Sequence, residues 1–381
     1  MALPFRFQQS ALPLPYGRER HLAVTWKNAV IVWGGQSISE DDAMSVVYYH
    51  ISGKWIKKLT SGDMPECNSI GTKRGHVIED KLYVLDLAFI AVIYCLDLET
   101  WIWSRFTPNG TPPATSIWAF SSWAYKGKIF CFGGNINFGR KTNQLFCYNV
   151  SNNSWEWPEQ KGDIPSPRMD HLTVISGESV FLFGGITNQD TPPRYIHDTD
   201  LYILDMQTLK WDGVNGNIGQ PWPTTNVVRS KGTLTLISLS AAILFTEYEC
   251  WLMNLNSAKQ LQDPSSIWTP IPNNFNKMIV VRAAVVEPVR EKLWFMGGYD
   301  LLNHCYISDV LVMSFKLSLR EFAVDRVARC ICPHDPRLAP DKCPKLLREE
   351  IDSIRPEIGE NISCGQFEDC PVSQPTKSSL R

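Results

Sequence analysis

Four runs of β-branched and aromatic residues along the chain end in a pair of glycines. They are AVIVWGG, KIFCFGG, SVFLFGG and KLWFMGG, and their first glycines are Gly34, Gly133, Gly184 and Gly297. The intervals between these glycines are 99, 51 and 113 residues, so two intervals are about twice the third. Such periodicity is typical of folds that stack one repeated unit. The pattern therefore predicts two degenerate copies, found at KLYVLDL and AAILFTE, with Asp86 and Thr246 in place of the first glycine.

Each repeat carries the signals of four antiparallel strands. A strand-like segment such as RHLAVTW precedes the glycine pair, and an aromatic or aliphatic residue further on is followed seven residues later by tryptophan. These pairs are Tyr48 and Trp55, Tyr94 and Trp101, Tyr148 and Trp155, and Leu204 and Trp211. Seven residues fit the end of one strand, a tight polar turn and the start of the next strand. Six such units, from about Arg18 to Phe315, predict an all-β, six-bladed β-propeller.

The last blade has no fourth strand after DVLVMSF. We expect the N-terminal segment PFRFQQ to supply it and to close the ring; the alternative is a disordered N-terminus. Glycine permits close backbone approach and positive φ near the axis. Asp86 and Thr246 lack that freedom, so we expect local distortion in blades 2 and 5.

An amphipathic segment follows the last blade. In SLREFAVDRVARCI (318–331), apolar residues recur at spacings of three and four, which predicts a helix with one apolar face. Ser318 and Glu321 form a capping-box pattern at its start. A proline-rich turn and a second short helix, KLLREEIDSI, follow, and from Arg355 on the polar chain is expected to be disordered. The first helix either packs on a blade or presents its apolar face to a partner.

Composition and charge narrow the class of protein. The 381 residues carry a formal net charge of -2, so no overall field favours nucleic acid or a membrane surface. The N-terminus has no apolar run long enough for a signal peptide, and no stretch approaches the roughly 20 apolar residues of a membrane span. The eleven cysteines are scattered through strand-like segments and are expected to be reduced and buried. We therefore expect a cytoplasmic or nuclear protein.

The glycine pairs, the spaced Tyr and Trp, and the period of about fifty residues together resemble the kelch repeat over about 300 of the 381 residues. The resemblance implies a kelch β-propeller with a short C-terminal helical tail. Kelch propellers are mostly binding platforms, and some are enzymes of the galactose oxidase type.

The tail resembles a ligase-adaptor motif. Ser318-Leu319, Ala323 and Val327 are similar to the Elongin B/C-binding box, and Phe322 lies on the same apolar face. Seventeen residues after Val327, the stretch CPKLL, with Pro344 and Leu347, is similar to a degraded Leu-Pro cullin-contacting box. Cys343 stands there in place of the usual leucine, which leaves the choice of cullin open. Together with the propeller, the tail resembles the kelch domain-containing substrate receptors of cullin-RING ubiquitin ligases, which implies Elongin B/C and a cullin of the Cul2 or Cul5 type as partners.

Propeller ligands sit where the loops after the glycine pairs meet the loops that lead into each first strand. The leading loops carry a basic set: Arg18, Arg20, Lys73, Arg74, Arg168, Arg229, Lys231 and Arg282, with Ser230 among them. The other loops carry Arg140, Lys141, Arg194 and His304. A guanidinium fork binds both oxygens of a carboxylate, which suits the C-terminus of a target protein. The alternative is that an arginine beside the first strand pairs within the scaffold.

The resemblance to receptors of C-terminal glycine extends to some of these residues. Those receptors have an arginine directly after the fourth glycine pair, where this chain has Ile186. Arg194 corresponds to a second arginine in the same loop, and Ser230, in Arg229-Ser230, matches a serine that leads into blade 5. The predicted substrate-binding residues are therefore Arg194, Arg229, Ser230, Arg168 and Arg74, without an assumed specificity for glycine.

Enzymatic and metal-binding alternatives lack their residue sets. Galactose-oxidase chemistry needs copper held by Tyr and His, but His21, His76 and His171 fall at equivalent repeat positions and are expected to belong to the scaffold. The spacings between Cys330, Cys332, His334 and Cys343 do not match those of a structural zinc site. No catalytic residue, metal or cofactor is predicted.

The sequence thus predicts a propeller at 1–317, a helical tail at 318–354 and a disordered tail at 355–381. The predicted function is substrate recognition for a cullin-RING E3 ubiquitin ligase. The alternative is a non-enzymatic kelch scaffold or cytoskeletal interaction module with no ligase role.

Overall fold

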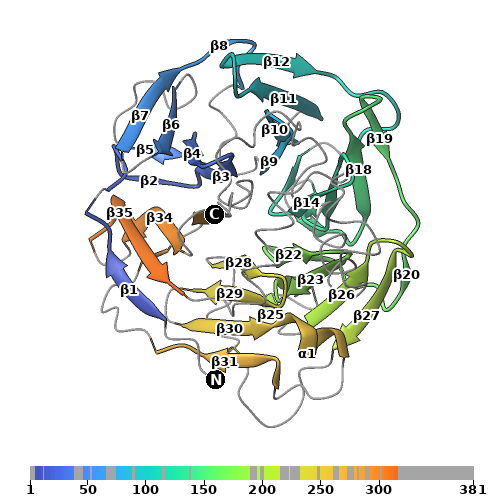
Figure 1. Cartoon of the computed structure of the whole chain (residues 1–381). Coiled ribbons are helices and arrows are strands. Elements are labelled where there is room, and N and C mark those ends of the chain that lie inside the picture. The colour runs from blue at the N-terminus through green and yellow to red at the C-terminus, as the bar shows by residue number, and fades with distance from the viewer. Residues whose placement is uncertain are drawn as a thin grey trace, which may run out of the picture.

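Six antiparallel sheets stand around a central axis in the computed structural model of the chain (Figure 1). The structure describes residues 5–11, 13–37, 46–51, 54–65, 74–87, 91–113, 116–136, 139–188, 195–197, 201–214, 223, 232–246, 249–260, 266–272, 279–280, 283–287, 292–300 and 303–315. Each sheet contains four strands in a row, and the sheets follow the six sequence repeats. The predicted six-bladed, all-β propeller is confirmed.

The four strands of each blade follow one another from the axis outward. Blade 1 contains β3 (Leu22–Trp26), β4 (Ala29–Trp33), β6 (Val46–Ile51) and β7 (Lys54–Leu59), and blade 2 contains β9 (Arg74–Ile78), β10 (Lys81–Asp86), β11 (Val92–Asp97) and β12 (Ile102–Phe106). Blade 3 contains β14 (Ser121–Tyr125), β15 (Lys128–Phe132), β18 (Leu145–Asn149) and β19 (Ser154–Glu156), and blade 4 contains β22 (Leu172–Ser176), β23 (Ser179–Phe183), β26 (Leu201–Asp205) and β27 (Lys210–Val214). Blade 5 contains β28 (Thr233–Ser238), β29 (Ala241–Phe245), β30 (Cys250–Asn254) and β31 (Trp268–Pro270), with helix α1 (Leu255–Gln260) between the last two. Blade 6 contains β33 (Ala284–Glu287), β34 (Lys292–Asp300), β35 (Cys305–Ser314) and β1 (Arg6–Gln9), and β32 (Ile279–Val280) also pairs with β34.

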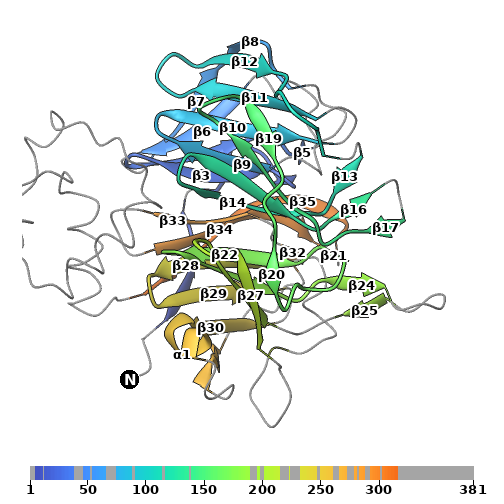
Figure 2. The same ribbon diagram turned by 90° about the vertical axis from the view of Figure 1, so that its right-hand side faces the viewer.

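Short ribbons project from one end of the ring, which we call the Gly-Gly face because the glycine pairs lie there (Figure 2). In each ribbon the loop that leads into a first strand pairs with the loop that follows the glycine pair. The ribbon strands are β2 (Arg18–Glu19) and β5 (Gln36–Ser37) in blade 1, β13 (Ile117–Trp118), β16 (Asn135–Ile136) and β17 (Arg140–Lys141) in blade 3, and β21 (Arg168–Met169), β24 (Ile186–Asn188) and β25 (Tyr195–His197) in blade 4. The opposite end, which we call the hairpin face, carries the turns between the first and second strands and between the third and fourth.

The second strands are buried on both of their faces, because each blade is packed between two others. Every residue of AVIVW in β4 and of AAILF in β29 is buried. The sequence of a strand covered on both sides is a continuous apolar run, without the alternation of apolar and polar residues seen in half-exposed strands. This burial explains why the six second strands are the most recognisable part of each repeat.

A tryptophan at one register position of the outer strand joins each of the first five blades to its neighbour. The five residues are Trp55, Trp103, Trp155, Trp211 and Trp268, which face His50, Leu96, Tyr148, Leu204 and Met253 of the third strands. Three of these rings pack at a tilt against the aromatic residue that ends the second strand of the preceding blade: Trp33 with Trp103 at 5.0 Å, Phe132 with Trp211 at 5.0 Å and Phe183 with Trp268 at 4.8 Å. These contacts bury large rings in the seams and so stabilise the ring of blades.

The register corrects the predicted pairing of aromatic residues in blades 1 and 2. Tyr148 and Leu204 do face Trp155 and Trp211, as their spacing predicts. In blade 1 the hairpin is two residues shorter, so His50 rather than Tyr48 faces Trp55. In blade 2, Trp103 takes the strand position, and Trp101 lies in the turn with a φ of 64°. Because strand positions two apart share a face, a spacing rule alone does not separate these choices.

The N-terminal segment closes the ring, as predicted. β1 pairs antiparallel with β35 along Arg6–Gln9 and is the outermost strand of blade 6. Phe7 faces Met313, which is the register position that the five tryptophans occupy in the other blades, and it packs against the cluster of Phe245 and Phe295. Blade 6 is therefore built from both ends of the propeller sequence.

The two degenerate blades depart from the glycine geometry in different ways. The glycines of the four regular pairs all have positive φ, whereas Asp86 and Thr246 do not. Asp86 continues β10 and pairs with Val92. Thr246 instead makes a local turn in which its hydroxyl accepts a hydrogen bond from the Glu249 N–H at 3.0 Å, and blade 5 also has a register shift in its first strand pair.

Candidate interaction site

The leading loops of blades 1 and 4 each begin with a buried arginine that supports the glycine pair. Arg18 Nη1 donates to the carbonyl of Gly34 at 3.0 Å, and Arg168 Nη1 donates to the carbonyl of Gly184 at 2.8 Å. Both side chains also lie over a tyrosine ring of their own blade, 5.1 Å from Tyr48 and 4.9 Å from Tyr202 respectively. The two arginines are equivalent parts of the scaffold.

Arg168 was predicted to bind a target, and its surroundings argue for the scaffold alternative. Its side chain is 0% exposed, and its Nε and Nη2 donate to the carbonyl and hydroxyl of Ser166 at 3.1 and 3.0 Å. A ligand would have to break these hydrogen bonds inside the protein, and a buried charge without partners is costly.

Arg74 contacts the neighbouring blade from the start of β9. Its Nε donates to the carbonyl of Phe120 in blade 3 at 3.1 Å, and its guanidinium lies 5.5 Å from the Phe120 ring. The side chain is half-buried rather than enclosed. Arg74 therefore links blades 2 and 3 at the Gly-Gly face while remaining at the surface.

Two equivalent histidines fill the space that the glycine pairs leave open. A Cβ on Gly133 would lie 2.7 Å from Cε1 of His171 in the next blade, and a Cβ on Gly297 would lie 3.0 Å from Cε1 of His21. Burial and the nearby Arg18 charge lower the pKa of His21 to about 3, and burial with the Arg168 charge holds the pKa of His171 well below its usual range. Both imidazoles are therefore neutral parts of the seams.

Two serine–histidine pairs also lie in the seams. Ser121 Oγ and His171 Nε2 share a hydrogen bond of 2.7 Å, and so do His76 Nε2 and Ser122 Oγ. The predicted equivalence of His76 with the other two is wrong, because His76 lies within β9, three positions further along its repeat. Burial and the Arg74 charge lower the pKa of His76 to about 4. Each pair bridges two neighbouring blades.

Among the described residues, three of the basic groups predicted on the Gly-Gly face are exposed. Arg20, Arg140 and His304 are exposed there. Arg20 lies 3.5 Å from Glu19 and has a φ of 57°. Lys141, by contrast, is 6% exposed, and burial lowers its pKa.

The remaining predicted site residues lie outside the described residues. They include Arg194, Arg229 and Ser230, which were predicted to bind substrate, and also Lys73, Lys231 and Arg282. The whole of the predicted tail from 318 on also lies outside the described residues, including Ser318, Leu319, Phe322, Ala323, Val327, Pro344 and Leu347. Their roles stay predictions.

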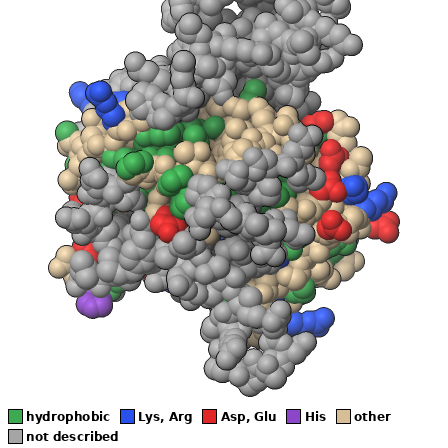
Figure 3. Space-filling view, turned by 90° about the horizontal axis from the view of Figure 1, so that it is seen from below, with side chains coloured by type: hydrophobic (Ala, Val, Ile, Leu, Met, Phe, Trp, Pro, Cys, Tyr) green, Lys and Arg blue, Asp and Glu red, His purple; other side chains and the backbone are tan. Residues whose placement is uncertain are grey.

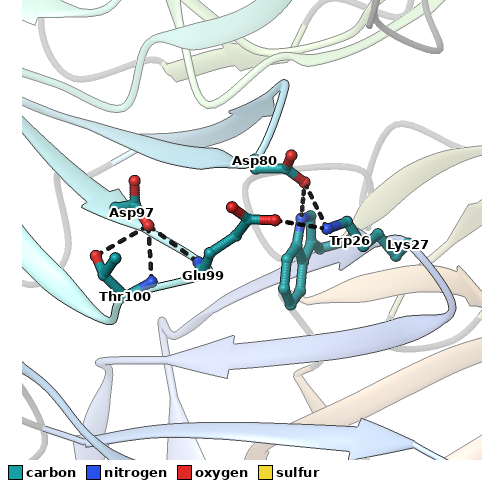
Figure 4. A network of polar contacts seen from close by, with 6 residues as sticks. All are labelled: Trp26, Lys27, Asp80, Asp97, Glu99 and Thr100. Atoms are coloured by element: carbon teal, nitrogen blue, oxygen red, sulfur yellow. Dashed lines mark hydrogen bonds and ion pairs between the residues drawn. The ribbon is translucent and has the colours of Figure 1, made fainter. Parts of the chain in front are cut away.

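The hairpin face is held together by polar clusters that join neighbouring blades (Figure 4). Trp26 Nε1 donates to Asp80 Oδ1 at 2.8 Å, and Lys27 Nζ lies 3.1 Å from the carboxylates of both Asp80 and Glu99. Asp97 Oδ1 fixes the turn below by accepting from the backbone N–H of Glu99 and Thr100, which lowers its pKa.

Blades 3 and 4 repeat this cluster at equivalent positions. Tyr125 and Lys126 bind Glu178 at 3.2 and 3.5 Å, and Gln207 also donates to Glu178. The charges described at these two seams are thus satisfied within the fold.

The side of the ring seen in Figure 3 has no large patch of one charge among its described side chains. Hydrophobic side chains gather toward the upper left of that view, and charged side chains of both signs lie next to one another at the right. The described residues contain no cluster of three or more His, Cys, Asp or Glu that could hold a metal ion. None of the described helices is long and apolar enough to cross a membrane.

Comparison with known proteins identifies the repeat. The family model described as "KLHDC2/KLHL20/DRC7 Kelch-repeats domain" matches residues 20–238. Kelch domain-containing protein 1 of Homo sapiens is 29% identical over 239 residues, which cover 52% of this chain and 57% of that protein. Host cell factor of Drosophila melanogaster is 24% identical over 310 residues, which cover 75% of this chain and 16% of that protein. The chain therefore spans less than two thirds of the length of these relatives.

The fold is shared with solved structures of much lower sequence identity. The structure of YjhT aligns with a TM-score of 0.57 at 11% identity, and the alignment covers 80% of this chain and 99% of that one.

Proposed function

Because the chain belongs to the KLHDC2/KLHL20/DRC7 kelch-repeat family and carries a kelch-repeat protein-interaction domain, we propose that it recognises substrates for a cullin-RING E3 ubiquitin ligase. In this proposal the propeller binds a target protein, and the tail binds Elongin B/C and a cullin of the Cul2 or Cul5 type. The chain itself performs no chemistry.

The observation that carries the proposal is the order of the two parts along the chain. The ring is complete at Phe315, and the motif Ser318-Leu319, with Ala323 and Val327, begins three residues later. β35 runs from the Gly-Gly face to the hairpin face, since Ser314 pairs with Lys292 at the start of β34. The chain therefore leaves the ring at the face opposite the leading loops, which supports simultaneous binding of a target and a ligase.

For the target site we propose a terminal carboxylate bound by Arg194 and Arg229, with Ser230 as a hydrogen-bond donor. Arg18 and Arg168 would support that site from below, because their guanidinium groups hold the backbone around the glycine pairs. Charge reversal at Arg194 and Arg229 should weaken the binding of peptides with a free C-terminal carboxylate. Equal binding of free and amidated peptides would reject this part of the proposal.

The second candidate is a kelch scaffold without a ligase role. It is favoured by the use of the described leading-loop arginines within the fold. In that case the tail helix only packs on the propeller.

Co-purification separates the two candidates. The full chain should bring down Elongin C from a cell lysate, and Leu319→Asp should abolish this association, because a carboxylate would be placed in an apolar helix–groove contact. Asp325→Asn, on the opposite face of the predicted helix, is the matched control and should leave it unchanged. If wild type brings down no Elongin C, or if Leu319→Asp behaves like wild type, the ligase role is wrong.

A further inference from the structure

Among the described residues, three connections between blades add a short parallel segment to the outer edge of the blade that follows. We call these segments clasps: Ser61–Gly62 (β8) on β12, Asn109–Gly110 on β19 and Lys161–Gly162 (β20) on β27. In the first, the N–H groups of Ser61 and Asp63 donate to the carbonyls of Trp101 and Trp103 at 3.2 and 3.1 Å. In the third, Lys161 and Asp163 donate to Leu209 and Trp211, both at 2.9 Å.

The clasps of blades 2 and 4 share a sequence pattern, Gly-Asp-Met-Pro at 62–65 and Gly-Asp-Ile-Pro at 162–165. Glycine is required because a Cβ at either position would collide with the carbonyl oxygen of the neighbouring tryptophan, and both glycines have positive φ. Two residues before each glycine, a side chain accepts a hydrogen bond from the tryptophan indole. Thr60 Oγ1 accepts from Trp103 Nε1 at 3.1 Å, and Gln160 Oε1 accepts from Trp211 Nε1 at 2.8 Å.

Blade 1 has no such clasp among the described residues. The segment after β1, which would supply it, continues along β35 instead: Ser10 N–H donates to Val310 at 2.8 Å and Leu14 N–H to Ser308 at 2.7 Å. Among the described strands, β7 is therefore the last of its sheet. Figure 1 shows β8 beyond β12 and β20 beyond β27, whereas no described strand lies outside β7.

The indole of blade 1 lacks the partner that the clasps of blades 2 and 4 provide. Trp55 holds the register position of Trp103 and Trp211, and its Nε1 is buried with no hydrogen-bond partner in the described part of the chain. Trp155 Nε1 is also without one, but there the clasp is present and Pro108 stands where Thr60 and Gln160 stand in theirs. The unpaired indole in blade 1 therefore coincides with a missing clasp rather than with an unsuitable residue in it.

The surface of β7 is apolar and positively charged. Leu59 is 67% exposed and Ile56 is 37% exposed. Lys54, Lys57 and Lys58 are exposed, and no ion pair joins them to a carboxylate in the described ranges. The equivalent of Lys54 in blade 4 is Lys210, which lies 2.8 Å from Asp212 and whose pKa is raised by Asp212 and, more weakly, by the clasp residue Asp163.

We propose that the outer edge of β7 binds an extended peptide segment of a partner protein, added as a parallel strand in the manner of the chain's own clasps. The segment has a side-chain acceptor two residues before a glycine and an aspartate directly after it. In the register of the other clasps the glycine lies beside Trp55 and the aspartate beside Ile56, on the face that carries Lys54 and Lys58. Main-chain hydrogen bonds provide affinity, and the acceptor, glycine and aspartate provide specificity.

The competing explanation is protective. Lysines on an exposed edge strand prevent pairing with other chains. Under that explanation the edge of β7 binds no peptide, so a binding experiment decides between the two.

The probe is a labelled peptide of the chain's own clasp sequence, Leu-Thr-Ser-Gly-Asp-Met-Pro, capped at both ends and titrated into the full chain with anisotropy as the readout. We expect saturable binding, and we expect slower hydrogen exchange of the backbone amides in residues 54–59 when the peptide is bound. Absence of binding, or protection confined to other strands, rejects the proposal.

Two matched comparisons locate the contact. The peptide with valine in place of glycine should bind at least about tenfold more weakly, because its Cβ meets the Trp55 carbonyl. Lys54→Glu should weaken binding of the original peptide about fivefold through loss of an ion pair and added repulsion, whereas Lys57→Glu, on the other face of β7, should change it less than about twofold. Equal binding of both peptides, or equal effects of the two substitutions, overturns the assigned geometry.

Discussion

At the scale of single residues, neutral histidines occupy seams between blades. His21 lies between blades 6 and 1, His76 between blades 2 and 3, and His171 between blades 3 and 4. His21 and His171 are buried, His76 is half-buried, and each lies near an arginine, so protonation is disfavoured in the folded state. The seams therefore tie the stability of the ring to pH.

We predict that stability falls as the pH is lowered below about 6.5. Above this value the histidines are neutral in both the folded and the unfolded state. Below it the histidines of the unfolded chain bind protons, whereas in the folded state His21 and His76 stay neutral down to their pKa values of about 3 and about 4. Each of the two should lower the free energy of unfolding by about 1.4 kcal/mol per pH unit in this window. Urea denaturation between pH 7 and pH 5 measures the slope.

The test variant is His76→Gln, which should reduce this slope. The matched control is His304→Gln, which should leave the slope unchanged because the His304 side chain is exposed. A pH-independent denaturation midpoint would contradict neutral histidines in the seams.

Two glycines with almost the same φ separate backbone strain from crowding. Gly133 has a φ of 67° and Gly127 a φ of 69°, but a Cβ on Gly133 would lie 2.7 Å from His171, whereas one on Gly127 meets nothing within 4 Å. We predict that Gly127→Ala lowers the free energy of unfolding by about 1 kcal/mol and Gly133→Ala by about 3 kcal/mol, because overpacking adds to the strain. Similar losses in thermal or urea denaturation would show that the seam tolerates a methyl group.

Residue-level roles were only partly predictable from the sequence. Repetition marks Arg18 and Arg168 as equivalent, but only the structure reveals that their guanidinium groups bind the carbonyls of Gly34 and Gly184. A basic leading loop has the same composition whether its arginines point into the scaffold or toward a ligand. Burial, which decides between the two, depends on the neighbouring blade.

At the scale of elements, the outer strand decides how blades join. Five blades place a tryptophan at one register position, and blade 6 receives Phe7 there from the other end of the chain. The strand in PFRFQQ could be predicted because the last repeat lacked a fourth strand and this segment lies just before the first blade. The clasps were not predicted, because two-residue strands carry no periodicity; the repeated Gly-Asp-Met-Pro and Gly-Asp-Ile-Pro was the available signal.

We predict that Phe7→Ala destabilises the protein by about 2 kcal/mol, since a partly buried aromatic ring is lost from the closing strand. Phe7→Trp, which restores the residue of the other blades, should be tolerated, and the exposed neighbour Gln8→Ala should change stability by less than about 0.5 kcal/mol. Chemical denaturation of the three variants is the measurement. An effect of Phe7→Ala no larger than that of Gln8→Ala would mean that β1 does not hold the ring.

At the scale of the whole molecule, the two faces of the propeller carry different structural features. The Gly-Gly face carries the leading loops and the ribbons. The hairpin face is stabilised by hydrogen bonds and ion pairs between neighbouring blades, and the chain leaves the ring there after Phe315. The overall architecture was predictable because six weak signals repeat. The assignment of partners rests on motifs that occur once, at 318–347, and these have no second copy against which to check them.

The most direct test of the ligase proposal uses purified components. The full chain is mixed with Elongin B, Elongin C and a cullin of the Cul2 or Cul5 type, and the molar mass of the eluted species is measured by size-exclusion chromatography with light scattering. The proposal predicts one co-eluting complex with a single copy of each protein, which Leu319→Asp dissolves while the variant keeps the β-sheet circular dichroism of wild type. Elution of the wild-type chain alone, at its monomer mass with both cullins, would contradict it.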